Sequence, residues 1–153
     1  MTKNFLEINN VTFAASAQSK VNNVSLTIEN QGDIVCLLGP SGIGKTTILR
    51  TIAGLEKIQS GKIILKNKIL SSDKTHIEPE NRNISMGFQD NSLFPHYTVL
   101  ENIKFGADRN KKKKKGLNLN EINKLLHIEH IADKYPHQIS SGEAQRASLA
   151  RSL

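Results

Sequence analysis

The chain has 153 residues, a length that suits one domain of ordinary size with a buried core. Its hydrophobic content of 37% and charged content of 23% are typical of a globular protein, and no run approaches the roughly 18 apolar residues of a membrane-spanning helix. Cys36 is the only cysteine, which excludes an internal disulfide, and its apolar neighbours predict a small buried hydrophobe. Because the first ten residues lack an apolar signal region, we expect a cytoplasmic chain.

The formal net charge of +7 raises the question of nucleic-acid binding. Lys111–Lys115 supply five of these charges in one block, which leaves +2 elsewhere. Nucleic-acid-binding surfaces usually spread basic residues along a face, with aromatic residues that stack on bases. Aromatic residues are only 5% of this chain, and none lies among the lysines. We therefore interpret the block as a solvated loop and expect no nucleic-acid partner.

The start of the chain is rich in predicted strands. Residues 5–13 and 24–29 have strand character, the second alternating as VSLTIE, and residues 14–20 between them form a turn. NQGD, residues 30–33, predicts a second turn. The apolar run IVCLL, residues 34–38, is typical of a buried parallel strand.

A glycine-rich loop follows, and the periodicity predicts a helix from Lys45 that Gly54 ends as a C-terminal cap. GKIILKNKIL, residues 61–70, is either a hairpin or one long strand, and residues 83–89 are a further strand candidate.

Beyond this point the periodicity becomes helical. The helical stretches are VLENIKFG, LNEINKLLHIEHIADKY and GEAQRASLARSL, set apart by Pro95, the lysine loop and Pro136. The sequence therefore predicts an α/β chain with a β-rich part, residues 1–89, and a helical part, residues 90–153.

GPSGIGKT, residues 39–46, matches the pattern G-x-x-x-x-G-K-[ST] at every fixed position. Glycines at this spacing let backbone N–H groups turn inward around an anion, and the helix that follows points its positive end at the same place. Lys45 would reach the β- and γ-phosphates, Thr46 would ligate Mg²⁺, and Thr47 would reach an α-phosphate oxygen. A chance turn is the alternative, but the apolar run before the motif and the periodic helix after it are the context that the motif requires. The expected nucleotide contacts are Gly39, Pro40, Ser41, Gly42, Gly44, Lys45, Thr46 and Thr47.

ISSGEAQRASLARSL, residues 139–153, begins with Ser140 and Glu143 in the order S-x-x-E, a capping box that satisfies N–H groups at a helix start. Taken alone, this box is a structural device. Together with the phosphate motif, the run resembles the signature motif of ABC-type ATPases, usually LSGGQ followed by a QR-x-x-x-ARAL helix. Residues 82–106 are also similar to the Q-loop region of that family, and KYPHQISSGEAQR to the stretch that leads into its signature. The resemblance covers essentially the whole chain.

The resemblance implies a P-loop NTPase core with an N-terminal antiparallel β-subdomain and an α-helical subdomain. In that family two ATPase domains dimerise head to tail, and each ATP lies between the phosphate loop of one subunit and the signature helix of the other. This implies ATP and Mg²⁺ as cofactors, and contacts from Ser140, Ser141, Gly142 and Glu143 to the nucleotide of the second subunit. Gln89 matches the family glutamine that approaches Mg²⁺ and the attacking water.

Some residues depart from the family pattern. Ser141 stands where the signature usually has glycine and would crowd the nucleotide, while Glu143 replaces glutamine and would repel phosphate unless it turns back as the cap. The family also offers an aromatic residue that stacks on adenine, at a position that looks like Ala15 here. Phe13, two residues earlier on the same face of a strand, is the candidate substitute.

In this family the strand that supplies the acidic Mg²⁺ ligand (Walker B) and a histidine that contacts the γ-phosphate both follow the signature helix. This sequence stops at Leu153, and its five histidines all precede the signature. We therefore expect a truncated chain that lacks the Walker B strand, is poorly stable alone and hydrolyses no ATP above background.

GLEKIQSGKI and FQDNSLFPHYTVLENI look most like ATPase subunits of bacterial importers for ferric iron, polyamines, sulfate or thiamine, with iron placed first from the KYPHQ lead-in. The resemblance implies a homodimer or a paired ATPase subunit, a membrane permease partner, an indirect link to a periplasmic binding protein, and a location on the inner face of the cell membrane. Two alternatives stay open: a non-transport ABC ATPase acting in translation or repair, and a catalytically dead nucleotide-binding module.

Overall fold

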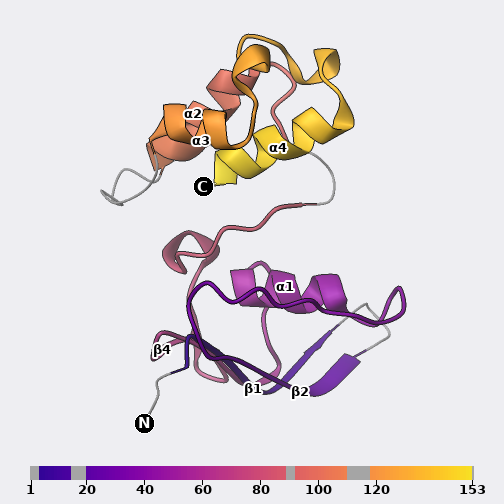
Figure 1. Ribbon diagram of the computed structural model, residues 1–153. Coiled ribbons are helices and arrows are strands. Elements are labelled where there is room, and N and C mark those ends of the chain that lie inside the picture. The colour runs from indigo at the N-terminus through magenta and orange to yellow at the C-terminus, as the bar shows by residue number, and fades with distance from the viewer. Residues whose placement is uncertain (1–3, 15–19, 89–91, 110–117, 153) are drawn as a thin grey trace. The chain divides into compact units, whose positions relative to one another are not determined.

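The computed structural model describes residues 4–14, 20–88, 92–109 and 118–152. The chain divides into two compact units, Met1–Ile84 and Ser85–Leu153, whereas the sequence placed the boundary between residues 89 and 90. The first unit is a sheet covered on one face by a helix, and the second is a group of helices (Figure 1). Each unit is described by itself below.

The first unit is built on a five-stranded sheet in which every hydrogen-bonded pair of strands is antiparallel. The first two predicted strands are confirmed, and the structure adds that β1 pairs with β2 from Leu6↔Ile28 to Ala14↔Lys20. β2 begins at Lys20, earlier than the predicted residue 24, and residues 15–19 of the predicted turn lie outside the described residues. The predicted turn after β2 is also present, with Asp33 N–H donating to the Asn30 carbonyl at 3.4 Å. In sheet order the strands are β2 (Lys20–Ile28), β1 (Leu6–Ala14), β3 (Ser60–Leu65), β4 (Lys68–Ser72) and β5 (Thr75–His76).

Residues 61–70 form a hairpin and not one long strand. Lys66 and Asn67 have φ values of 47° and 66°, and Leu65 pairs with Lys68 across them. Two consecutive positive φ angles are the requirement of a type I′ turn, whose twist matches that of the flanking strands. Asparagine tolerates this conformation better than most residues, so the KN pair carries the local signal for the hairpin.

An irregularity in β1 places its apolar residues on one face of the sheet. Leu6 and Ile8 are buried, and so are Val11 and Phe13, although strict alternation from residue 8 would bury residue 10 next. Asn10 has φ 49°, and the register with β2 shifts between Ile8 and Val11, as in a β-bulge. The extra residue resets the alternation, so both apolar pairs reach the same core.

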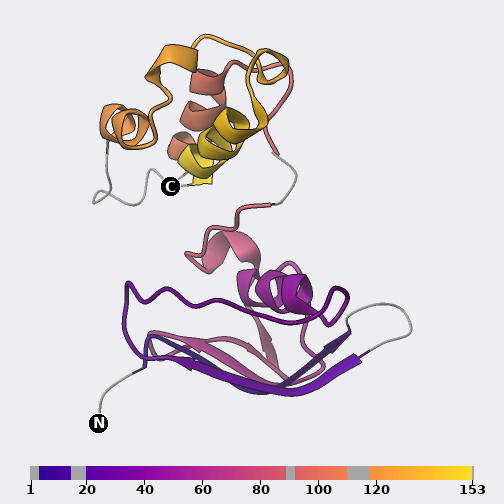
Figure 2. The same ribbon diagram turned by 45° about the vertical axis from the view of Figure 1, so that its right-hand side comes forward.

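Helix α1 (Lys45–Ala53) lies across this buried face of the sheet (Figure 2). Ile48, 6% exposed, joins the cluster formed by Ile8, Phe13, Ile63 and other strand residues. The helix ends as predicted, because Gly54 adopts φ 89° and its N–H donates to the Thr51 carbonyl at 3.1 Å.

The second unit contains α2 (Val99–Arg109), α3 (Leu119–Leu125) and α4 (Ser141–Ser152). Helix α4 turns Ala144, Ala147 and Ala150 into the core, and α2 packs against it. A Cβ at Gly106 of α2 would run into the Arg151 carbonyl, so the small residue permits this close approach. Each of the three stretches predicted to be helical therefore contains a helix.

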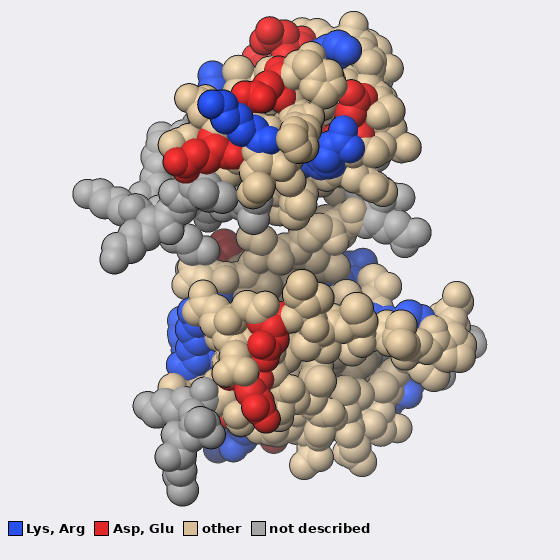
Figure 3. Space-filling model, viewed as in Figure 1, with Lys and Arg blue, Asp and Glu red and all other residues tan. Residues whose placement is uncertain are grey.

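The middle helical stretch is shorter than predicted. Helix α3 ends at Leu125, and His127 adopts φ 51°, a conformation that no α-helix continues through. The remainder forms two short 3₁₀ turns, Glu129–Ile131 and Pro136–Gln138. Acidic and basic side chains are interspersed on the visible face of this unit (Figure 3), whereas the lysine block lies outside the described residues.

Two strand predictions were wrong. Residues 34–38 form no strand, and Ile34 and Leu38 are 93% and 92% exposed. Cys36, predicted to be buried, is exposed with them. A parallel strand needs paired neighbours and cover on both faces, and this run joins none of the strands in the described part of the sheet. Residues 83–88 likewise form no strand.

No helix in the described ranges of the chain is long and apolar enough to cross a membrane.

We predict that Gly61→Ala destabilises the first unit more than Gly32→Ala does. Both glycines have positive φ, 92° and 100°, so each alanine incurs a conformational cost of about 1–2 kcal/mol. At Gly61 the new Cβ would also lie 2.5 Å from the Asn10 carbonyl oxygen, whereas at Gly32 no atom lies within 4 Å. Urea unfolding followed by circular dichroism measures both changes, and equal losses would contradict the strand contact.

Candidate nucleotide-binding site

The predicted phosphate motif forms an exposed loop that runs directly into α1. Gly44 is the N-cap residue of the helix and adopts φ 102°. A Cβ at this position would lie 2.9 Å from Val21 Cγ2, so both the backbone conformation and the space require glycine. Gly42 has φ 81°, and a Cβ added there would meet no atom within 4 Å, so only its conformation requires glycine. The loop therefore has room beside it for a ligand.

The start of α1 is left open to that loop. Gly44 provides no side-chain cap, and the first turn contains no acidic residue. The N–H groups of a first helical turn have no partner within the helix and carry the positive end of its dipole. These are the groups that bind phosphate at a helix N-terminus.

Lys45 places its ammonium group over the same loop. Its Nζ donates to the carbonyl oxygens of Gly39 at 2.7 Å and Pro40 at 2.6 Å. The lysine is thus folded back and held near the open helix start by neutral acceptors. Phosphate oxygens are stronger acceptors for an ammonium group than carbonyl oxygens, so a bound phosphate would compete for it.

The donor set of the loop fits a polyphosphate. It combines glycine-rich backbone, the open start of α1, the Lys45 ammonium and the hydroxyls of Thr46 and Thr47 in the first turn. Thr46 is exposed and Thr47 is half-buried, so the Thr46 hydroxyl is the one that solvent reaches freely. Ser41 lies in the exposed part of the loop.

Phe13, the candidate for adenine stacking, lies beneath the loop. It is 1% exposed, and a Cβ added at Gly44 would lie 3.4 Å from its ring. A small apolar hollow of about 140 Å³ beside it is lined by β1, β2 and loop residues, including Val24 and Ile43. The structure gives Phe13 a packing role, and stacking on a purine would require the ring to leave the core. Ala15 lies outside the described residues.

The second candidate site is the start of α4, and there the predicted capping box is confirmed. Glu143 Oε2 accepts from the Ser140 backbone N–H at 2.8 Å and from its hydroxyl at 2.7 Å, and Glu143 N–H donates back to Ser140 Oγ at 3.3 Å. The other carboxylate oxygen of Glu143 lies 3.0 Å from His130 Nε2. The carboxylate is therefore turned back toward its own chain.

These contacts change the acidity of Glu143. Hydrogen bonds from the Ser140 backbone, then from its hydroxyl and then from His130, lower the pKa of Glu143 from 4.5 to about 2. The residue is accordingly a carboxylate at neutral pH. Room remains beside it, because a Cβ at Gly142 would meet only Arg146 Nη1, at 3.7 Å, and Ser141 is exposed.

The structure thus gathers residues 39–47 around one open helix start and residues 140–143 around one capped helix start. Gln89 lies outside the described residues, so its role stays a prediction. Sequence reasoning missed His130 as a partner of Glu143 and Arg82 as a buried residue of the first unit. Neither has a local signal, since His130 is 13 positions from its partner and arginine is usually exposed.

A phosphate loop that opens α1, in a chain that also contains an antiparallel sheet and a helical unit, defines the class of P-loop ATP-binding domains. Comparison with known proteins specifies the family. Residues 21–153 match the family described as ABC transporter, and the chain belongs to this family.

Individual relatives agree with this assignment. The chain is 43% identical over 151 residues to a probable sulfate/thiosulfate import ATP-binding protein of Chlorella vulgaris, covering 95% of this chain and 61% of the relative. It is 42% identical over 158 residues to an Fe(3+) ions import ATP-binding protein of Escherichia coli O157:H7, covering 99% of this chain and 42% of the relative. The chain therefore spans less than two thirds of the length of either curated relative.

The fold agrees with solved cassettes as well. A bacterial ATP-binding cassette, solved as a dimer in a post-hydrolysis state with ADP and Pi, superposes with a TM-score of 0.73 at 28% identity. The match covers 97% of this chain and 68% of that cassette. The predicted membership in the ABC ATPases and the α/β fold class are both confirmed.

We predict that Glu143 makes the stability of the helical unit depend on acid. Because its pKa is lowered in the folded state, its stabilising effect is complete above about pH 4.5 and is lost as the pH falls toward 2. Glu143→Gln lacks this titration, so its thermal midpoint should fall less than that of the wild type between pH 6 and pH 3. Differential scanning calorimetry over that range measures the difference.

Glu129→Gln is the matched control, since it removes an acidic charge from the same unit outside the capping box. Its pH curve should parallel that of the wild type. If the Glu143→Gln curve also runs parallel, the capping carboxylate contributes nothing that acid can remove.

Proposed function

We propose that the chain is the ATP-binding part of an ABC-type importer, in which ATP binding and hydrolysis by a head-to-tail dimer drive solute uptake. The observation that carries this proposal is the open start of α1 beneath a glycine loop, with the Lys45 ammonium held over it. The family match and the import proteins among the relatives support the transport context.

In this proposal the loop binds the triphosphate through its backbone. N–H groups of the loop and of the first turn of α1 surround the β- and γ-phosphates, and Lys45 exchanges the carbonyls of Gly39 and Pro40 for phosphate oxygens. Thr47 reaches an α-phosphate oxygen. The Thr46 hydroxyl would hold Mg²⁺, and the ion would supply positive charge beside the phosphates.

The start of α4 supplies the second set of contacts. Ser140, Ser141 and Gly142 of one copy face the γ-phosphate bound by the other, with donors directed at charge that grows during transfer. Glu143 does not point at that phosphate in the proposal, because Ser140 and His130 retain its carboxylate. The dimeric cassette solved with ADP and Pi supports this arrangement. Gln89 is proposed to approach Mg²⁺ and the attacking water.

The remaining partners follow from the same proposal. The ATPase dimer drives a membrane permease at the inner face of the cell membrane. A periplasmic binding protein delivers the solute to the permease. Ferric iron is the solute that we propose first; one relative is named for Fe(3+) and another for sulfate/thiosulfate. Uptake of labelled iron and labelled sulfate by cells with and without the gene distinguishes the two.

We predict that Lys45→Ala weakens Mg-ATP binding about 10- to 100-fold, because a charged hydrogen bond of this kind contributes about 1.5–3 kcal/mol. Fluorescence titration with a labelled ATP analogue measures the dissociation constant. Lys62→Ala, which removes an exposed lysine from β3, is the charge-matched control and should bind like the wild type. Equal affinity in the wild type and Lys45→Ala would mean that the loop does not hold the triphosphate.

A further inference from the structure

Arg82 is a buried cation of the first unit. It follows the 3₁₀ turn η1 (Pro79–Asn81), is 1% exposed, and is the only charged residue in the buried set of the described chain. Within the described residues no carboxylate forms an ion pair with it at 4.0 Å or less. Burial lowers the pKa of Arg82, and the charge of Glu78 partly opposes this. A buried cation is costly unless its donors are satisfied.

All five N–H donors of the guanidinium have acceptors. Nε donates to the Ile77 carbonyl at 2.6 Å. Nη1 donates to the carbonyls of Thr51 and Ile52, both at 3.0 Å. Nη2 donates to Ser71 Oγ at 2.7 Å and lies 3.2 Å from His76 Nδ1. Arg82 is therefore held by hydrogen bonds to Ile77, to the end of α1, and to side chains of β4 and β5.

These acceptors belong to elements that are separate in the sequence. Thr51 and Ile52 are in the last turn of α1, where carbonyls lack intrahelical partners and the dipole favours a positive charge. Ser71 is in β4 and His76 in β5. A Cβ at Gly54 would collide with the Arg82 guanidinium, so the capping glycine also makes room for it. Arg82 thus ties the end of α1 to the far edge of the sheet.

The other end of the same helix opens into the phosphate loop. Helix α1 has nine residues, about 13 Å at 1.5 Å per residue, and behaves as a short rigid rod. Few of its residues are buried, Ile48, Thr51 and Ala53, and Ile48 and Ile52 pack against the sheet core. A change at its C-terminal tether therefore moves the N–H groups at Gly44 and Lys45, and small displacements of binding groups cost affinity.

We propose that Arg82 is a positioning residue of the phosphate loop, acting through α1, with His76 Nδ1 as one of its acceptors; the inference rests on the proposed nucleotide function. Because a guanidinium group can only donate, His76 Nδ1 is the acceptor of this pair, at 3.2 Å from Arg82 Nη2.

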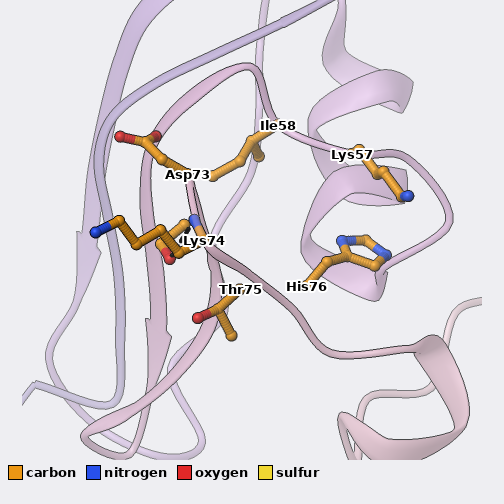
Figure 4. A pocket seen from close by; sticks show the side chains of 7 residues that line it. Lys57, Ile58, Asp73, Lys74, Thr75 and His76 are labelled. Atoms are coloured by element: carbon orange, nitrogen blue, oxygen red, sulfur yellow. Dashed lines mark hydrogen bonds between the residues drawn. The ribbon is translucent and has the colours of Figure 1, made fainter.

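Other charged groups surround His76. Glu78 Oε2 lies 4.0 Å from its Nε2, on the side of the ring away from the Nδ1 that faces Arg82. His76 also lines a hollow of about 270 Å³. Lys57 lies on the same side of this hollow as His76, and Asp73 and Lys74 lie on the opposite side (Figure 4). The imidazole is only 18% exposed, and the buried guanidinium of Arg82 lies 3.2 Å from it.

The test compares Arg82→Lys with Ile103→Val in the full chain. Lysine keeps the charge but cannot reach five acceptors in this geometry, whereas Ile103→Val removes a methyl group from the separate core of the second unit. With both variants measured well below their melting temperatures, we expect the Kd for labelled Mg-ATP to rise at least about 10-fold in Arg82→Lys and less than about two-fold in Ile103→Val. Equal rises would overturn the proposal.

Ser71→Ala provides a milder second variant, which removes one acceptor and keeps the rest. We expect an intermediate rise in Kd, and no rise at all would count against the tether. Amide NMR shifts of Gly44 and Lys45, recorded without nucleotide, should move in Arg82→Lys and Ser71→Ala but not in Ile103→Val. If the wild type binds no Mg-ATP, the proposed function fails, and these shifts alone decide the positioning role.

His76→Ala and His76→Asn test the acceptor at this position, because alanine removes it and the side-chain oxygen of asparagine can still accept from Arg82. We expect the Kd for labelled Mg-ATP to rise more in His76→Ala than in His76→Asn. Equal values in the wild type and His76→Ala would remove His76 from the tether.

Discussion

The two ends of α1 satisfy their backbone groups in opposite ways, and the candidate site depends on this difference. At the C-terminal end, Thr51 O accepts from Gly54 and Arg82, and Arg50 O accepts from Leu55. At the N-terminal end no side chain caps the helix. The carbonyls at the C-terminal end already have hydrogen-bond partners. At the N-terminal end the N–H groups have no side-chain cap and the helix dipole is positive, so this end can bind an anion. The glycines of the loop and Lys45 add further contacts to the anion-binding site that this difference between the helix ends creates.

Helix α4 begins with the same chemistry in a different state. Its start is occupied by the Ser140–Glu143 box, and His130 holds the second carboxylate oxygen. A phosphate that used the Ser140 hydroxyl would have to compete with a carboxylate at 2.7 Å. Glutamine at this position would offer a neutral acceptor for the same cap. The substitution from the usual signature therefore changes the charge at this helix start more than its geometry.

The run Ile34–Leu38 shows how far local pattern and tertiary context can diverge. Its composition is that of a buried strand, yet Ile34 and Leu38 are almost fully exposed. Burial requires partners, and the antiparallel sheet of the described residues ends at β2 and β5 without including this run. Arg82 is the converse case, since a residue type that is usually exposed is buried because five acceptors from distant positions converge on it.

The sequence alone determined the features that depend on nearby residues: the loop Gly39–Thr46 opening a helix, the Gly54 cap and the Ser140–Glu143 box, whereas residues 61–70 stayed open between a hairpin and one long strand. Each is specified by φ preferences or by hydrogen bonds that span four residues or fewer, so one stretch of chain contains the whole cause. Tertiary structure alone decided that Phe13 packs beneath the loop, that residues 34–38 stay unpaired, and that Arg82 joins α1 to β4 and β5. These outcomes depend on which distant segments meet, and no local preference encodes that.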